Sequence, residues 1–161
     1  MSNSSHGHAL PAKIAISIFL AGRYLFASFF WYGVWHKLTK GWLWSDILQS
    51  FLTAQLNNSR LLPLQVSFLE QFAIPNAFLI AWIVTIGELL VAIGLTLGIT
   101  VRLSGFLALF LMLNFTAGGY HNYLTLPLLS MAFLLMILPS GQWLGFDKKL
   151  HERYPNVLIF K

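Results

Sequence analysis

The sequence predicts an all-α integral membrane protein, a four-helix bundle with an amphipathic interfacial helix in the long loop between helices 1 and 2. Of its 161 residues, 57% are hydrophobic and 9% are charged, against roughly 25% charged residues in a soluble domain. Such a chain has too little polar surface to cover a water-soluble globule, and its apolar stretches can span about 30 Å of hydrocarbon. We therefore expect one transmembrane domain over residues 1–161, located in the cell membrane.

Four apolar segments are the expected spans, at residues 14–36, 76–99, 103–119 and 123–139. The first contains an arginine and follows a polar stretch, which is typical of a retained helix rather than of a cleaved signal peptide. The links between spans two and three, and between three and four, are only a few residues long. Short links make consecutive helices antiparallel neighbours, which predicts a compact bundle.

The connection between the first two spans is long and carries its own helical pattern. Within residues 43–57, Trp44, Ile47, Leu48 and Phe51 recur near helical spacing, with polar residues elsewhere around the turn. This pattern predicts an amphipathic helix lying in the membrane interface. Residues 62–72 could form a second short helix that ends before Pro75.

The distribution of Lys and Arg predicts the orientation. The side that carries both termini has six such residues and the opposite side has three. The six are Lys13, Arg102, Lys148, Lys149, Arg153 and Lys161; the three are Lys37, Lys40 and Arg60. Because positive residues concentrate on the cytoplasmic side, we expect both termini there. The formal net charge of +5 then reports orientation and contact with the lipid bilayer, not nucleic-acid binding.

Two charged residues interrupt the apolar spans, Arg23 in the first and Glu88 in the second. Each costs about 2.5–3.5 kcal/mol near the centre of a membrane helix, so each is expected to have a partner or a role. At 1.5 Å per residue, Arg23 lies about 13 Å and Glu88 about 16 Å from the inner ends of their spans. Antiparallel neighbours at that depth would form an ion pair, and Asn114 and Ser130 would reach a similar level.

Two interpretations of this layer are open. Arg23 and Glu88 could form a buried ion pair that fixes helix order and register. Alternatively, Glu88 could accept protons beside a redox ligand. On the second interpretation the candidate catalytic residues are Arg23, Glu88 and Asn114.

Aromatic residues gather near the other end of the first span. Seven of the twelve residues from Tyr24 to Trp35 are aromatic, and the turn between spans three and four adds more. Flat rings with nearby hydrogen-bond donors suit a quinone head group. The candidate quinone-binding residues are Trp31, Trp35, His36, Lys37, Tyr120 and His121. An ordinary aromatic belt at the interface is an alternative. A haem held by His36 and His121 is a third, which no second His pair or CxxCH sequence supports. No other metal site is predicted.

Several spaced motifs cover most of the chain. They are Arg23 in AGRYLFASFFWYG, Gly33 and Lys37 in GVWHK, Gly87-Glu88 in TIGELL, Gly98 to Arg102 in LGITVR, Asn114 in LMLNF, and GQWLGFDKKL from Gly141 to Leu150. In order and spacing they resemble the DoxX/DoxD-like family of four-helix membrane proteins. The DoxD branch is associated with thiosulfate:quinone oxidoreductase, which oxidises thiosulfate to tetrathionate and reduces quinone.

The resemblance implies a membrane subunit that passes electrons from thiosulfate to membrane quinone. Its implied partners are a second small subunit of the oxidoreductase and a terminal quinol oxidase or other membrane complex. The chain has no cysteine, but coupling two thiosulfates requires no enzyme thiol, and Lys37, Lys40 and Arg60 could attract the dianion. The alternative is a non-catalytic accessory subunit of a larger respiratory or photosynthetic membrane complex.

Overall fold

The computed structural model describes residues 9–57, 61–120, 122–157 and 159, and within these ranges it contains helices and no strands. The helices are α1 (Ala9–Thr39), α2 (Ile47–Leu56), α3 (Pro63–Phe68), the π-helix η1 (Leu69–Ala73), α4 (Ala77–Leu97), α5 (Val101–Ala117), α6 (Thr125–Ile137), α7 (Ser140–Trp143) and α8 (Asp147–Arg153). The predicted all-α class is confirmed. Of the predicted interfacial helix over residues 43–57, residues 47–56 form α2, and of the predicted segment 62–72, residues 63–72 fall in α3 and η1.

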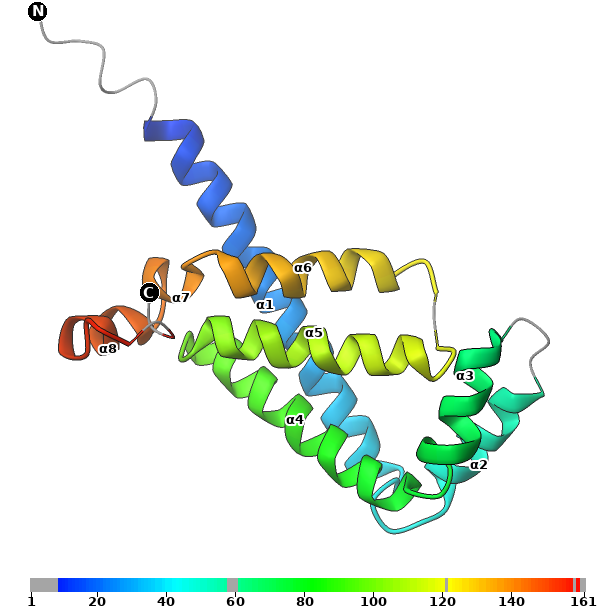
Figure 1. Cartoon of the computed structure of the whole chain (residues 1–161). Helices are drawn as coiled ribbons and strands as arrows, with labels where there is room; N and C mark the ends of the chain where they lie inside the picture. The colour runs from blue at the N-terminus through cyan, green and yellow to red at the C-terminus, as the bar shows by residue number, and fades with distance from the viewer. Residues whose placement is uncertain (1–8, 58–60, 121, 158, 160–161) are drawn as a thin grey trace, which may run out of the picture.

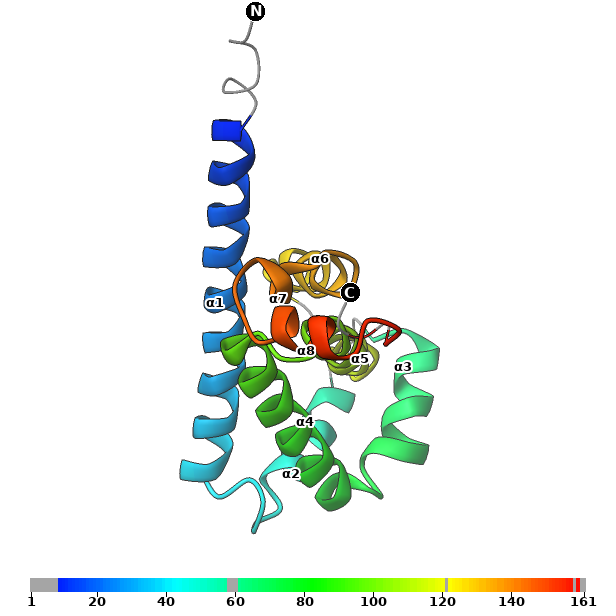
Figure 2. The same cartoon turned by 90° about the vertical axis from the view of Figure 1, so that its left-hand side faces the viewer.

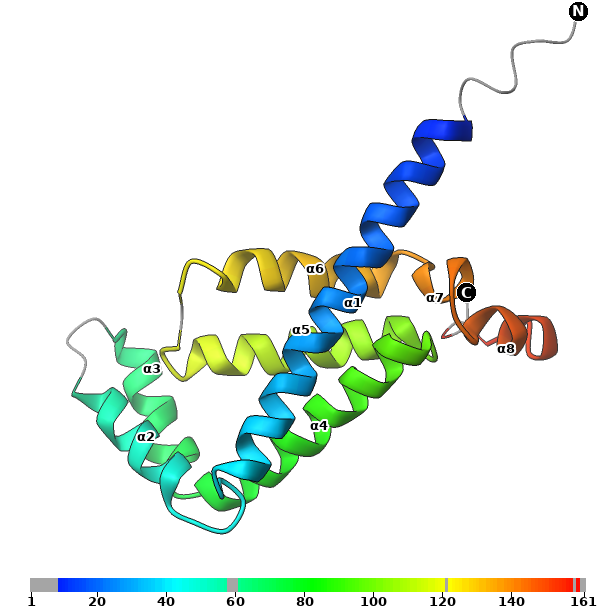
Figure 3. The ribbon, with the colours of Figure 1, turned by 180° about the vertical axis from the view of Figure 1, so that it is seen from behind.

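The four long helices pack as a chain of neighbours: α1 on α4, α4 on α5, and α5 on α6, with a smaller contact between α1 and α6. In Figures 1 and 3, α5 and α6 lie side by side, while α1 crosses them at a steep angle. Figure 2 shows the N-terminal part of α1 extending beyond the other helices. Accordingly, residues 11–18 are exposed apart from the half-buried Ile16.

Two helices are long and apolar enough to cross a membrane, α1 from Pro11 to Thr39 and α4. By contrast, α5 has 17 residues and α6 has 13, and both are shorter apolar helices. Membrane location is therefore supported by α1 and α4, whereas four complete spans and the position of α2 in the interface stay predictions.

The main core forms where α1, α4, α5 and α6 meet. Its buried side chains include Phe26, Phe30, Val91, Leu95, Leu111 and Leu135. Small residues bring the backbones together: a Cβ added at Gly105 would lie 2.6 Å from the backbone nitrogen of Met136. Hence α5 and α6 pack with almost no side chain between them at this level, a common device where lipid tails give no hydrophobic driving force between helices.

At one end of the bundle, the long connection folds back over the start of α4. Leu52 of α2, Leu69 and Ala73 of η1, and Ala77 of α4 form a second buried cluster. The Gln65 side chain ties this cap to α5, because its amide nitrogen donates to the carbonyl of Thr116 at 2.9 Å. The cap is therefore fixed to α4 and to the end of α5.

At the other end, the C-terminal segment is bonded to the turn between α4 and α5. The carboxylate of Asp147 accepts hydrogen bonds from the backbone N–H of Thr100 at 2.6 Å and of Val101 at 3.0 Å. Gly98 ends α4 with a φ of 65°, and a Cβ there would lie 2.6 Å from the Cα of Gly145. Asp147 thus satisfies two N–H groups at the start of α5 that no helical carbonyl can reach.

We predict that Asp147→Ala lowers the free energy of unfolding by about 1–3 kcal/mol, because the buried N–H of Val101 and the partly buried N–H of Thr100 lose their acceptor. The matched control is Asp46→Ala, since Asp46 precedes α2 without a side-chain capping bond. Reversible unfolding by dodecyl sulfate in mixed micelles measures both. Equal effects of the two substitutions would contradict the assignment.

A second prediction concerns the contact between α5 and α6. Gly105→Ala should destabilise the fold by about 1–3 kcal/mol through overpacking, because the new methyl group meets backbone rather than a movable side chain. At Gly118 a Cβ would make only ordinary contacts, the shortest 3.5 Å, so Gly118→Ala serves as the control. The same unfolding titration applies, and a Gly105→Ala protein as stable as its control would refute the close packing.

Candidate functional site

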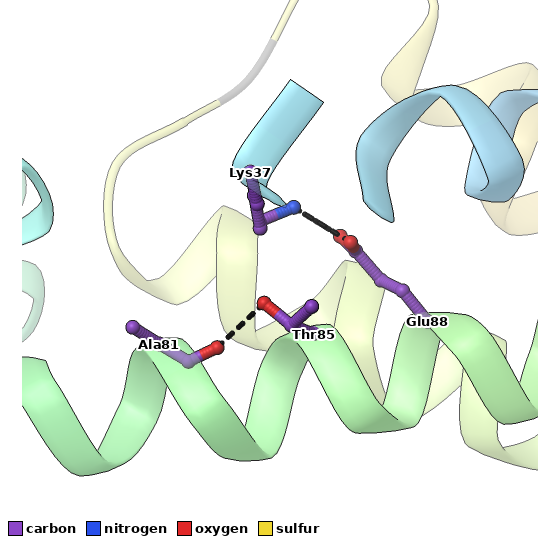
Figure 4. A network of polar contacts seen from close by, with 4 residues as sticks. All are labelled: Lys37, Ala81, Thr85 and Glu88. Carbon is purple, nitrogen blue, oxygen red and sulfur yellow. Dashed lines mark hydrogen bonds and ion pairs between the residues drawn. The ribbon is translucent and has the colours of Figure 1, made fainter. Parts of the chain in front are cut away.

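The centre of the site is a buried ion pair between α1 and α4 (Figure 4). The Nζ atom of Lys37 lies 2.7 Å from Oε1 and 2.6 Å from Oε2 of Glu88. Glu88 is 4% exposed. Lys37 comes from the last turns of α1 and Glu88 from the middle of α4, so the pair joins two helices far apart in sequence.

Small residues make room for this pair. A Cβ at Gly33, one turn before Lys37, would lie 3.1 Å from Oε2 of Glu88. A Cβ at Gly87 would lie 3.3 Å from Leu111 of α5. Thr85, one turn before Glu88, directs its hydroxyl to the carbonyl of Ala81 at 2.7 Å, as Figure 4 also shows. The carboxylate is therefore enclosed by helices, with Lys37 bonded to both of its oxygens.

The pairing of Arg23 with Glu88 expected from depth is wrong. Arg23 is fully buried, but its Nη1 donates to the carbonyl of Ser140 and its Nη2 to the carbonyl of Leu144, each at 2.7 Å. Its guanidinium also lies over the ring of Tyr24, 4.9 Å from the centroid. Arg23 thus holds the segment around α7 against α1.

The physical reason is the register between α1 and α4. Equal depth of Arg23 and Glu88 would require Ile14 and Ile99 to lie at the same level. Instead, α1 begins at Ala9 and its first turns project past the bundle. Ten residues separate Gly33 from Arg23 on α1, and ten separate Glu88 from Gly98 on α4, about 15 Å in each case. Arg23 therefore lies level with the end of α4, where Gly98 meets Gly145.

The expected polar layer does not form around Glu88. The Asn114 side chain donates to the carbonyl of Phe110 at 2.8 Å, and Ser130 donates to that of Leu126 at 2.9 Å. Both bonds stay within the residue's own helix. Among the described residues, no hydrogen bond links Asn114 or Ser130 to Glu88, so a catalytic role of Asn114 stays a prediction.

The two predicted aromatic groups are connected by a row of ring contacts. Ring centroids are 5.8 Å apart for Tyr32 and His36, 6.3 Å for His36 and Trp42, 6.1 Å for Trp42 and Phe51, and 6.3 Å for Phe51 and Tyr120. We call these five residues the aromatic row. It begins on α1, where His36 directly precedes Lys37, and runs over α2 to Tyr120, which follows the end of α5. Trp42 and Phe51 were not among the sequence candidates.

The other candidates differ in position. Trp31 donates from Nε1 to the hydroxyl of Thr96 at 3.1 Å, so its polar atom is used between α1 and α4. Trp35 is 68% exposed and belongs to the surface. His121, and with it the haem alternative, lies outside the described residues, and no group of three potential metal ligands occurs among those that are described.

Space and charge near the row limit what can bind. The pocket between α2 and the start of α4, which Trp42 helps to line, has a volume of about 20 Å³, room for about one water molecule. This pocket is therefore too small for a ring-sized ligand. Of the cations expected to attract a dianion, Lys37 is neutralised by Glu88, Lys40 is exposed, and Arg60 lies outside the described residues.

Comparison with protein-family models finds one family, DoxX, over residues 18–121. The matched range covers more than half of the chain and includes Arg23, Lys37, Glu88 and Asn114, whereas the segment from Gly141 onward lies beyond it. No curated protein and no solved structure matches significantly.

We predict strong coupling between Lys37 and Glu88 and none between Arg23 and Glu88. Lys37→Met should destabilise the fold by about 3–5 kcal/mol because it leaves a buried carboxylate unpaired, while Lys37→Met with Glu88→Leu should recover most of that loss. Double-mutant cycles on unfolding free energies test this. In the control cycle, Arg23→Met and Glu88→Leu should add within about 0.5 kcal/mol; the reverse pattern would restore the pairing expected from depth.

Proposed function

The chain belongs to the DoxX family, and we propose that it is a membrane subunit of a quinone-linked oxidoreductase that passes electrons from thiosulfate to membrane quinone. One observation carries the quinone half of the proposal: Lys37, which pairs with Glu88, directly follows His36 of the aromatic row on α1. The thiosulfate half rests on the resemblance of the motifs to the DoxD branch.

Reduction of the quinone to quinol requires two protons at its carbonyl oxygens. Oxidation of two thiosulfates to tetrathionate releases two electrons, and the quinone takes up these electrons with two protons to become quinol. An ammonium has three N–H donors, and Glu88 accepts from Lys37 with both oxygens, which leaves one donor for a quinone carbonyl. We assign the second donor to His36, since it precedes Lys37 and belongs to the row.

The two side chains of the ion pair differ in how far solvent reaches them. The Lys37 side chain is 14% exposed and that of Glu88 5%, so water or a ligand reaches the pair from the lysine side. In this proposal Glu88 keeps Lys37 charged and oriented, and Lys37 is the group that touches the substrate. Arg23 is assigned to structure, because its Nη atoms bond to backbone carbonyls.

We also propose how the subunit sits in the membrane. The helices α1, α4, α5 and α6 lie within the bilayer, with both termini on the cytoplasmic side, as the Lys and Arg bias favours. The amphipathic α2 lies in the opposite interface, where half-exposed Ile47 and Phe51 meet acyl chains while Gln49, Ser50 and Thr53 face water. A second small subunit and a quinol oxidase are the proposed partners.

A second candidate is a non-catalytic accessory subunit of a respiratory or photosynthetic complex. It is favoured by the exposed apolar start of α1, with Ile14 52% and Ile18 68% exposed, and by the small size of the pocket beside the row. Both features suit a chain whose surface packs against other helices. The two candidates differ in whether Lys37 must give up a proton.

The substitution Lys37→Arg distinguishes the catalytic subunit from the accessory subunit. Arginine keeps a cation beside Glu88 but cannot release its proton at physiological pH. We predict that the complex purified with its native partners still assembles with Lys37→Arg, while thiosulfate-dependent reduction of a soluble quinone falls about 100-fold, the lower range for a lost general acid. Lys13→Arg, at the exposed start of α1, is the control and should keep the wild-type rate.

The other outcomes are equally informative. A wild-type rate for Lys37→Arg would contradict proton donation by Lys37. Reduction with another donor but not with thiosulfate would overturn the thiosulfate assignment alone. No quinone reduction by the intact complex with any donor, together with loss of assembly in Glu88→Gln, would favour the accessory subunit.

A further inference from the structure

The end of the bundle at α8 presents a surface that the proposed redox function does not use. Figures 1 and 3 show α7 and α8 beside the turn between α4 and α5, where Asp147 bonds to Thr100 and Val101. Large apolar side chains remain open to solvent there: Leu144 is 51%, Phe146 49% and Tyr154 48% exposed. A polar, water-facing end would not be expected to expose these three together.

Cations lie among these exposed rings. Lys148, Lys149 and Arg153 are exposed on α8. The Lys149 ammonium lies 5.7 Å from the centroid of Phe146, and the Arg153 guanidinium 5.8 Å from that of Tyr154. The acidic residues do not cancel this charge, since Asp147 is buried against the start of α5 and only Glu152 is exposed on the helix. The surface is therefore both basic and aromatic.

Two buried side-chain nitrogen atoms beside this surface have no hydrogen-bond partner among the described residues, Nε of Arg102 and Nδ1 of His151. Both flank the contact between Val101 and Asp147: Arg102 follows Val101, and His151 is one turn after Asp147, on the same face of α8. A buried polar atom without a hydrogen bond costs about 1–3 kcal/mol. An acceptor from outside the chain would remove that cost.

We propose that this surface, formed by Arg102, Phe146, Lys148, Lys149, His151 and Arg153, binds the phosphate group of an anionic phospholipid of the adjoining leaflet. The phosphate oxygens accept from the basic side chains, and the aromatic rings lie at the level of the lipid head groups, where such rings are favoured. We name it the α8 surface.

The position along the chain selects a lipid rather than an acidic protein. The apolar helix α6 ends at Ile137, and α7 begins only three residues later at Ser140. If α6 lies in the bilayer, as proposed above, the following segment is held at the head groups. Basic residues there gain attraction to the anionic surface, and exposed apolar side chains gain burial in it. The inference rests on the membrane placement but not on the redox activity.

The test uses the full-length chain in neutral detergent, without its partners, and measures retention of added phosphatidylglycerol or phosphatidylcholine by native mass spectrometry. The wild-type chain should retain phosphatidylglycerol in preference to phosphatidylcholine. Lys149→Gln should weaken that retention about fivefold, the effect expected for one basic residue at an anionic surface, and Lys149→Arg should restore it. Lys40→Gln, which removes the same charge at the opposite end of the bundle, is the matched control and should change nothing.

Melting temperatures of the variants establish that each is folded. We expect them to be folded, because Lys149 and Lys40 are exposed. Equal retention of the two lipids, or an equal loss with Lys40→Gln, would overturn the proposal. If inorganic phosphate raises the melting temperature as much as phosphatidylglycerol does, the ligand is a soluble anion and the lipid proposal is overturned. Because no quinone or thiosulfate is present, failure here leaves the redox proposal standing.

Discussion

The packing of the bundle depends on one constraint: a carboxylate buried between apolar helices must have a cation at contact distance. Lys37 meets this requirement by bonding to both oxygens of Glu88. Sliding α1 along α4 by one turn would move the ammonium about 5 Å along the helix and leave two buried charges unpaired. A pair of this kind adds little net stability over apolar side chains, but breaking it is costly, so its main effect is to select one register.

The register then determines the opposite end of the bundle. Gly33 of α1 lies against Glu88 of α4. Arg23, which precedes Gly33 on α1, is therefore level with the end of α4. There, the carbonyls of Ser140 and Leu144 belong to a segment already tied to the turn before α5 by Asp147. Arginine suits this place because its fork of donors can reach two carbonyls at once. The motif residues thus separate into an ion-pair end and a structural end.

Sequence reasoning located the helices more reliably than it located their contacts. Hydropathy gave the four long helices with ends within about five residues, because apolar length is encoded locally. The partner of Glu88 was missed because depth counting needs the ends of α1 and α4 to be level, and hydropathy cannot fix that. A signal was present: Gly33, four residues before Lys37, leaves an open helix face beside a lysine. Trp42 was missed because its place depends on the turn at Gly41, where φ is 74°.

The buried Arg23 and the partly exposed Lys37 have different partners, and this difference bears on the chemistry proposed for each. Both Nη atoms of Arg23 bond to backbone carbonyls, and these bonds hold the segment around α7 against α1. In the proposed function Lys37 gives up a proton, which would leave the Glu88 carboxylate without its counter-charge in apolar surroundings, a state that cannot persist. The proposal therefore requires the proton to return quickly, and it assigns the route from water to the side of the pair where the Lys37 side chain is 14% exposed. Under the proposed function, the enclosed Glu88 makes Lys37 a donor that is refilled after each transfer.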